Sequence, residues 1–426
     1  MTTDLSTLTP LERRNFWLHV LEGGFYMGGI AFLSAEVVLP EMVDTLGGKP
    51  WLIAYMPTLM LIGFFLPSLV VVPLINRLHR FKPVIVLTGV LQRLPFLVAA
   101  AFLWFFADDF PRWTLFVVVA APLVSGLLGG LTINAWLEMI TRMIPEQARA
   151  SGWAFRFIIA SVIGIIAGPI IHRILEIQPG PPGYAVLHLI TFIFLAISMV
   201  FFCFLKETHF PVPLPPNKRP SYFAELADIP RKAKRAPYFV RYLLVRFTGI
   251  GYAVLAPFLA IHALQITGRP EADLGYFVTA EMIGAVAGNL VAARLGDRHG
   301  GKIVLILSRT VLITVSLLVI VTASFPGFLV AFFLFGFTLF ADRVGDLTLG
   351  VDLAPPRNRA DFLAIMTFIL VPAMIMAAQL SSTIENVSGT LGAAAIATIA
   401  VALTSLAILL TIPEPRKTNN LNAPNQ

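Results

Sequence analysis

The chain has 426 residues, of which 57% are hydrophobic and 13% charged, and its net charge is +7. Its mean hydropathy of +0.81 lies far above that of an average soluble domain, which excludes an ordinary water-soluble enzyme or binding module. A single cysteine, Cys203, excludes a disulfide framework and a thiolate metal site.

Long apolar segments follow one another along the chain. A helix needs roughly 20 apolar residues to cross a bilayer core about 30 Å thick, and its backbone groups must be satisfied within the helix. Candidate spans cover residues 16–42, 51–75, 83–107, 113–141, 153–175, 184–205, 238–265, 274–293, 303–325, 327–352, 362–384 and 389–412. The sequence therefore predicts an all-α, polytopic membrane protein with twelve transmembrane helices.

Basic residues are concentrated in alternate connections between these spans. The sparse set of connections keeps only Lys49, Arg112, Arg173 and Arg269. Under the positive-inside rule, this asymmetry places both termini in the cytoplasm, and a plasma membrane, the inner membrane of a bacterium, is the expected location. Anionic lipid headgroups rather than nucleic acid then account for the positive net charge.

Residues 206–237 interrupt the apolar pattern. They contain a cluster of prolines and the basic run Arg231–Arg235. We interpret the segment as a linker, either a solvated tether near anionic headgroups or a site for a specific partner. It separates an N-terminal six-helix bundle, residues 1–205, from a C-terminal one, residues 238–412, and residues 413–426 form a tail.

Two short patterns recur in the two halves. The turns after spans four and ten, Pro145–Ala150 and Pro355–Ala360, both read P-x-x-x-R-A. The turns after spans two and eight, Asn76–Arg80 and Asp297–Gly301, correspond more loosely. Because they fall at matching positions, they predict two pseudo-symmetric bundles related by an axis along the membrane normal.

The segment Gly296–Lys302 resembles the loop signature of the major facilitator superfamily, in which an acidic residue and basic neighbours join the second and third helices of a half. The resemblance covers nearly the whole chain and implies a permease. It also implies that charges in these turns latch the cytoplasmic side in one state. The first-half copy has Asn76 for the acid and His79 for the glycine. The expected gate residues are Arg77, Arg80, Glu138, Arg149, Asp297, Arg298, Lys302, Arg343, Asp346 and Arg359.

Span five contains a second motif. Gly164, Gly168 and Pro169 form a G-x-x-x-G-P pattern similar to the core of the antiporter signature in drug exporters of the same superfamily. The resemblance implies proton antiport, although His172 and Arg173 stand where two further glycines are usual. The alternative interpretation is close helix packing with a proline kink.

Ionisable residues within the first-half spans are candidate sites, because a charge at the bilayer centre costs at least ~2.5 kcal/mol. Glu36 is predicted to bind substrate or protons, or else to reach water at the outer edge. Glu22 is interpreted as interfacial, near Arg13 and Arg14. Arg93 lies about 16 Å into the membrane and is predicted to pair with a carboxylate, with Glu36 as one candidate.

Second-half candidates are Arg246, Glu281 and Asp342, each either in a structural pair or in contact with a ligand. Asp342 is expected to titrate, to bind a cation, or to join a gate network with Arg298 and Arg359. The spacing predicts that Arg343 neutralises a neighbouring aspartate on its own helix.

Several motifs are absent from the sequence. No phosphate-binding loop, metal-binding histidine spacing or nucleophile elbow is present, which argues against an enzyme, a cofactor or ATP-driven transport. The leading hypothesis is a monomeric, proton-coupled exporter of a small amphipathic or cationic compound. The alternatives are a proton- or sodium-coupled importer of a nutrient or organic anion, anchored by Arg93 and Arg246, a transport-inactive sensor, and a membrane-embedded enzyme.

Overall fold

The computed structural model describes residues 8–75, 78–207, 238–353 and 365–414. Within this part of the chain, twelve helical segments are long and apolar enough to cross a membrane, from Pro10–Thr45 to Leu391–Leu410. They coincide with the twelve predicted spans, which confirms an all-α, polytopic membrane protein. Most of the expected linker and tail lies outside the described residues.

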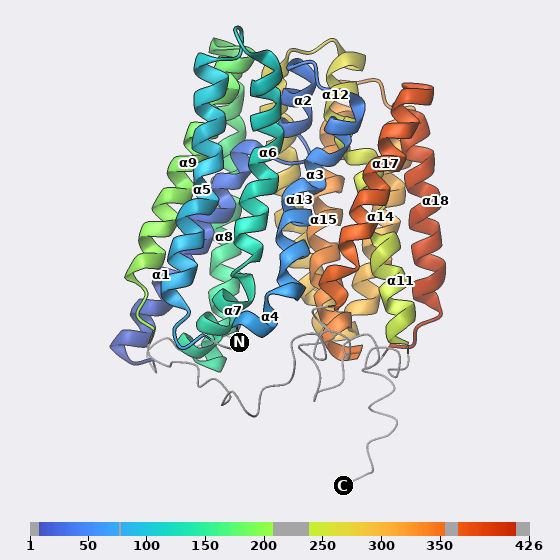
Figure 1. The fold of residues 1–426 in the computed structure, drawn as a ribbon. Helices are drawn as coiled ribbons and strands as arrows, with labels where there is room; N and C mark the ends of the chain where they lie inside the picture. The colour runs from blue at the N-terminus through green and yellow to red at the C-terminus, as the bar shows by residue number, and fades with distance from the viewer. Residues whose placement is uncertain (1–7, 76–77, 208–237, 354–364, 415–426) are drawn as a thin grey trace. The chain divides into compact units, whose positions relative to one another are not determined.

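Two compact units divide the chain, one made of Met1–Gly48 with Leu59–Tyr222 and the other of Lys49–Thr58 with Phe223–Gln426. In the first unit, α1 packs against α8 and α9, while α5 packs against α6 and α9 (Figure 1). The helices from its beginning to its end are α1 (Pro10–Ile30), η2 (Ala31–Leu33), α2 (Val38–Thr45), α3 (Pro50–Val70, whose first residues fall in the second unit), α4 (Val72–Ile75), α5 (Lys82–Phe105), α6 (Pro111–Gly130), α7 (Ile133–Met143), α8 (Glu146–Ile177) and α9 (Pro181–Phe204).

In the second unit, α13 and α14 pack against α15, and α18 packs against α11, α12 and α14. Its helices are α11 (Phe239–Gly249), α12 (Tyr252–Thr267), η4 (Glu271–Asp273), α13 (Leu274–His299), α14 (Gly301–Val321), α15 (Phe325–Leu353), α17 (Leu370–Ser388) and α18 (Leu391–Leu410).

Local sequence explains where several helices begin and end. Thr9 caps α1 in a capping box with Glu12, in which each side chain accepts a hydrogen bond from the other residue's backbone N–H. Gly268 and Gly389, at φ 63° and 59°, end α12 and α17 in the left-handed conformation that glycine adopts without strain.

Span one is broken rather than continuous. After η2, Ser34 restarts the helix, because its carbonyl accepts from the N–H groups of Val38 (2.9 Å) and Leu39 (3.0 Å) and its hydroxyl accepts from Val37 (3.2 Å). The polar backbone at the break is thus bonded locally, as an apolar surrounding requires. Glu36 lies in this turn and is half-buried.

Glycines allow the closest helix crossings. A Cβ at Gly24 of α1 would lie 2.5 Å from Ile159 of α8, and one at Gly284 of α13 would lie 1.8 Å from the Phe333 carbonyl oxygen of α15. Both separations are far below van der Waals contact. Small residues at these seams let helix backbones approach each other, which is how membrane helices gain packing energy.

Candidate functional site

A cavity of about 120 Å³ lies among the helices of the first unit. Its polar lining comes from four spans: Glu22 and Tyr26 of α1, Gln92 and Arg93 of α5, Thr132 between α6 and α7 with Trp136 of α7, and Arg156 of α8. Its apolar lining includes Phe64, Ile85, Met199 and Phe202. The cavity therefore combines charged, aromatic and aliphatic surfaces within membrane-spanning helices.

Arg156 and Glu22 form a buried ion pair in this cavity. Arg156 Nη1 lies 2.5 Å from Glu22 Oε2, and the two side chains are only 5% and 8% exposed. Nη1 also donates to the carbonyl of His19 at 3.1 Å. The guanidinium lies 5.1 and 5.2 Å from the rings of Trp136 and Trp153, within cation–π range.

A glycine makes room for this pair. A Cβ at Gly23 would lie 1.7 Å from Arg156 Cζ, so no larger residue fits beside the guanidinium as it stands. The sequence interpretation of Glu22 as interfacial was wrong, because the side chain is buried against a cation from another helix. It also missed Arg156, and the available signal was an arginine inside the apolar run of span five.

Arg93 is buried in the same cavity, with 5% of its surface exposed. Its Nε donates to the carbonyl of Leu195 at 2.6 Å, Nη1 to the carbonyl of Gly89 at 2.5 Å, and Nη2 to Ser198 Oγ at 3.3 Å. The predicted carboxylate partner was wrong: in the described part of the chain, Arg93 donates to main-chain carbonyls and a hydroxyl and lies 5.6 Å from the Tyr26 ring, and Glu36 does not line the cavity.

Neutral polar contacts complete the cavity wall. Gln92 donates to the Tyr26 hydroxyl at 2.7 Å, and the hydroxyls of Thr88 and Thr132 lie 2.8 Å apart. Thr132 sits where the fourth span is interrupted between α6 and α7. These bonds fix side chains from α1, α5 and the interruption around the two guanidinium groups.

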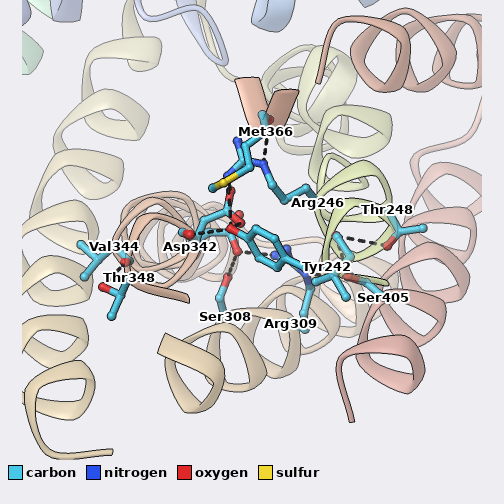
Figure 2. A network of polar contacts seen from close by, with 12 residues as sticks. Tyr242, Arg246, Thr248, Ser308, Arg309, Asp342, Val344, Thr348, Met366 and Ser405 are labelled. Carbon is cyan, nitrogen blue, oxygen red and sulfur yellow. Dashed lines mark hydrogen bonds and ion pairs between the residues drawn. The ribbon is translucent and has the colours of Figure 1, made fainter. Parts of the chain in front are cut away.

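A separate polar network lies inside the second unit (Figure 2). Arg309 of α14 is 2% exposed, and its Nη1 lies 2.5 Å from Asp342 Oδ1 of α15. Arg309 Nε donates to Ser405 Oγ of α18 at 3.1 Å, and Ser308 Oγ donates to Asp342 Oδ1 at 3.3 Å. Three helices are thus joined around one buried charge pair.

A second pair lies beside it. Arg246 of α11 forms an ion pair with Asp346 and donates from Nε to the carbonyl of Met366 at 2.9 Å, while Tyr242 donates to Asp346 Oδ1 at 2.8 Å. The predicted neutralisation by Arg343 was wrong, because that side chain is exposed and lies over Phe340. Each aspartate pairs across helices instead.

Two of the expected gate residues bind groups close to them in the sequence. Glu138 pairs with Arg142 at 2.8 Å, whereas Arg149 donates to the carbonyls of Thr141 and Ile144 at the end of α7. Asp342 pairs with Arg309 rather than with the predicted Arg298. Exposed side chains are Arg80, Asp297 and Arg298, while Arg77 and Arg359 lie outside the described residues.

Two lysines, near the N-termini of α5 and α14, bind the C-terminal ends of other helices. Lys82 Nζ donates to the carbonyls of Cys203 (2.7 Å) and Leu205 (2.6 Å), at the C-terminal end of α9. Lys302 Nζ, predicted as a gate residue, donates in the same way to the carbonyls of Leu410 (3.4 Å) and Ile412 (2.5 Å), at the end of α18. Positive charge at a helix C-terminus is favourable.

The remaining candidate residues lie within α13 and α8. Glu281 is buried on α13 with 1% exposure. Gly164 and Gly168 are buried in α8, which continues as a helix through the exposed Pro169. No group of three or more potential metal ligands occurs among the residues that the structure describes.

The sequence profile of the Major Facilitator Superfamily matches residues 242–426. A D-xylose-proton symporter resembles the chain with a TM-score of 0.68 at 13% identity, covering 95% of this chain and 98% of its own. A POT family transporter crystallised with 5-aminolevulinic acid gives 0.65 at 13%, covering 94% of each. A bacterial homologue of the iron transporter ferroportin gives 0.63 at 15%, covering 95% and 99%. No curated protein sequence matches. The chain thus has the twelve-helix fold of the major facilitator superfamily.

Proposed function

We propose that the chain is a secondary transporter of this superfamily, which moves a small molecule across the membrane by alternating access and couples the movement to protons. The observation that carries the proposal is the cavity of the first unit. Two arginines and a glutamate are brought together there inside apolar spans, where each buried charge is costly. The structural neighbours that share the fold are themselves transporters by name.

Glu22 is the best-placed proton site. Of the described residues that line the cavity, it is the one carboxylate. A proton on Glu22 removes the charge that neutralises Arg156, and the guanidinium then becomes available to a substrate. Arg156 Nε is already buried without a hydrogen-bond partner in the described part of the chain. Proton binding and release at Glu22 would therefore change the charge of the cavity in which the substrate binds.

The other assignments from the sequence stay predictions. Glu36 and Asp342 are alternative proton sites, and both termini are placed in the cytoplasm of a bacterial inner membrane. Export follows from the antiporter-like motif at Gly164, Gly168 and Pro169. Uptake is the second candidate, and the positive charge of the cavity favours it for an anionic compound.

The test is proton flux in liposomes that contain the purified full-length protein and an internal pH-sensitive dye. Compounds that raise its thermal stability are added under proton gradients of each direction, so that export and uptake are both measured. Glu22→Gln should bind the compound and exchange it across the membrane, but should no longer respond to the proton gradient. Glu176→Gln, in an exposed pair with Arg173, is the matched control and should behave as wild type.

Two results would contradict the proposal. Binding without any flux would indicate a sensor instead of a transporter. Flux in Glu22→Gln that still follows the proton gradient would move the proton site to another carboxylate.

A further inference from the structure

The two units have polar residues at matching positions. These positions can be counted from two lysines that make the same kind of contact in each unit. Lys82 and Lys302 bind the ends of α9 and α18 in the same way. Six residues after these lysines stand Thr88 and Ser308. Counting from the lysines therefore aligns α5 with α14, with a hydroxyl side chain at the same position of each helix.

The partner helices repeat as well. Ser198 and Ser405 stand seven residues before Leu205 and Ile412, the carbonyls that the two lysines bind. Each serine accepts a hydrogen bond from a buried arginine, Ser198 from Arg93 and Ser405 from Arg309. Arg309 corresponds by count to Gly89, and Arg93 reaches back one turn so that its Nη1 binds the Gly89 carbonyl. A guanidinium therefore binds the equivalent serine in both units.

The acid that accompanies it is present in one unit only. Asp342 stands thirteen residues before Pro355 of the repeated P-x-x-x-R-A turn, and the residue thirteen before Pro145 is Thr132. The contacts agree with this count, because Ser308 bonds to Asp342 and its counterpart Thr88 bonds to Thr132. The first unit thus keeps the arginine and lacks the carboxylate.

The consequence is an excess of one positive charge in the cavity. The cavity is lined by two guanidinium groups and one carboxylate, and Glu22 is paired with Arg156. Arg93 has five N–H donors, of which three are used by the carbonyls and the serine. A buried cation left in this condition is costly, and an anionic ligand in the cavity offsets that cost.

We infer that the cavity binds the carboxylate of a small organic monoanion at Arg93, with the apolar body of the ligand against Phe64, Ile85, Met199 and Phe202. A single net positive charge matches a carboxylate, whereas a phosphate monoester carries about −1.5 to −2 at pH 7. Amines are repelled by the same charge. This inference names the substrate class of the transport site and rests on the proposed function for flux, but not for binding.

The first experiment measures thermal stability of the purified full-length protein with four probes of similar shape: benzoate, benzamide, benzylamine and phenyl phosphate. A ligand that binds the folded state raises its apparent stability by mass action. Benzoate should stabilise at millimolar concentration, and the neutral amide at least about tenfold less effectively, as expected for a charge-assisted hydrogen bond. Equal or greater stabilisation by any other probe, or none by benzoate, overturns the inference.

The second experiment restores the missing acid. Thr132→Asp places a carboxylate where the second unit has Asp342, so that Arg93 gains an internal partner and benzoate should bind at least about tenfold more weakly than to Thr132→Asn. Asparagine and aspartate have nearly the same size, so the comparison isolates the charge. Equal benzoate affinity in the two variants would refute the assignment. If Thr132→Asp does not fold, the four-probe series on the wild type decides alone.

The two proposals fail in different ways. Stabilisation by benzoate without flux in liposomes leaves the binding site standing and removes the transport function. Proton-coupled flux of a cation or a neutral compound, without stabilisation by benzoate, does the reverse.

Discussion

Asp342→Asn tests whether the carboxylate of the second unit holds a buried charge. The substitution keeps the shape and one oxygen acceptor but removes the negative charge 2.5 Å from Arg309 Nη1, and Arg309 is only 2% exposed. Breaking a buried ion pair by removing one partner costs about 3–5 kcal/mol. Because 19% of the Asp342 side chain is exposed and water can screen the remaining charge, we expect the lower end, about 3 kcal/mol.

The assay is equilibrium unfolding of the purified protein in detergent. Glu176→Gln is the control for the same chemical change, because its pair with Arg173 is 52% and 68% exposed and should contribute no more than about 1 kcal/mol. The double variant Arg309→Met, Asp342→Leu should be more stable than Asp342→Asn, since an apolar replacement leaves no unpaired charge. A loss below about 0.5 kcal/mol in Asp342→Asn, the scatter expected of a surface substitution, would refute the reasoning.

Two further predictions concern glycines. Gly284→Ala should lower the free energy of unfolding by about 1–3 kcal/mol or more, because its Cβ would lie 1.8 Å from a carbonyl oxygen of α15. The control is Gly392→Ala, whose Cβ would have nothing within 4 Å and which should leave the free energy of unfolding unchanged or raise it by up to about 1 kcal/mol. Equal effects of the two substitutions in the same unfolding assay would contradict the packing. Gly23→Ala should displace Arg156 and abolish proton-coupled flux, and unchanged flux would show that the guanidinium is not needed where it stands.

Hydropathy was sufficient to predict the twelve spans, because a lipid environment imposes the same local requirement on every helix. It did not predict the breaks. The interruption of span one depends on the hydroxyl and carbonyl of Ser34, and the predicted span 113–141 runs across the interruption at Leu131 and Thr132. A single polar residue that bonds its own backbone gives no signal in an average over a window.

The charged sites could be predicted from the sequence only in part. The cost of burial correctly identified Arg93 and Asp342 as residues that need partners, but not which partners. A carboxylate was expected for Arg93, whereas main-chain carbonyls of α5 and α9 are within reach because Arg93 extends along the helix surface. The cost of burial did not identify Arg156, because this residue lies three residues inside the predicted span 153–175, where an arginine side chain can also reach the membrane interface. Pairing across helices depends on tertiary packing, which one sequence does not contain.

The lysines at the start of α5 and α14 have a mechanical consequence. Each ammonium binds two carbonyls at the C-terminal end of α9 or α18, the last helix of its unit. A pulling force on the segment that follows is therefore shared with α5 or α14 before it can unfold the helix end. A reporter protein fused to the C-terminus should therefore leave α18 helical as far as Leu410. The same contacts at the end of α9 should protect that helix from strain transmitted along the segment that joins the two units.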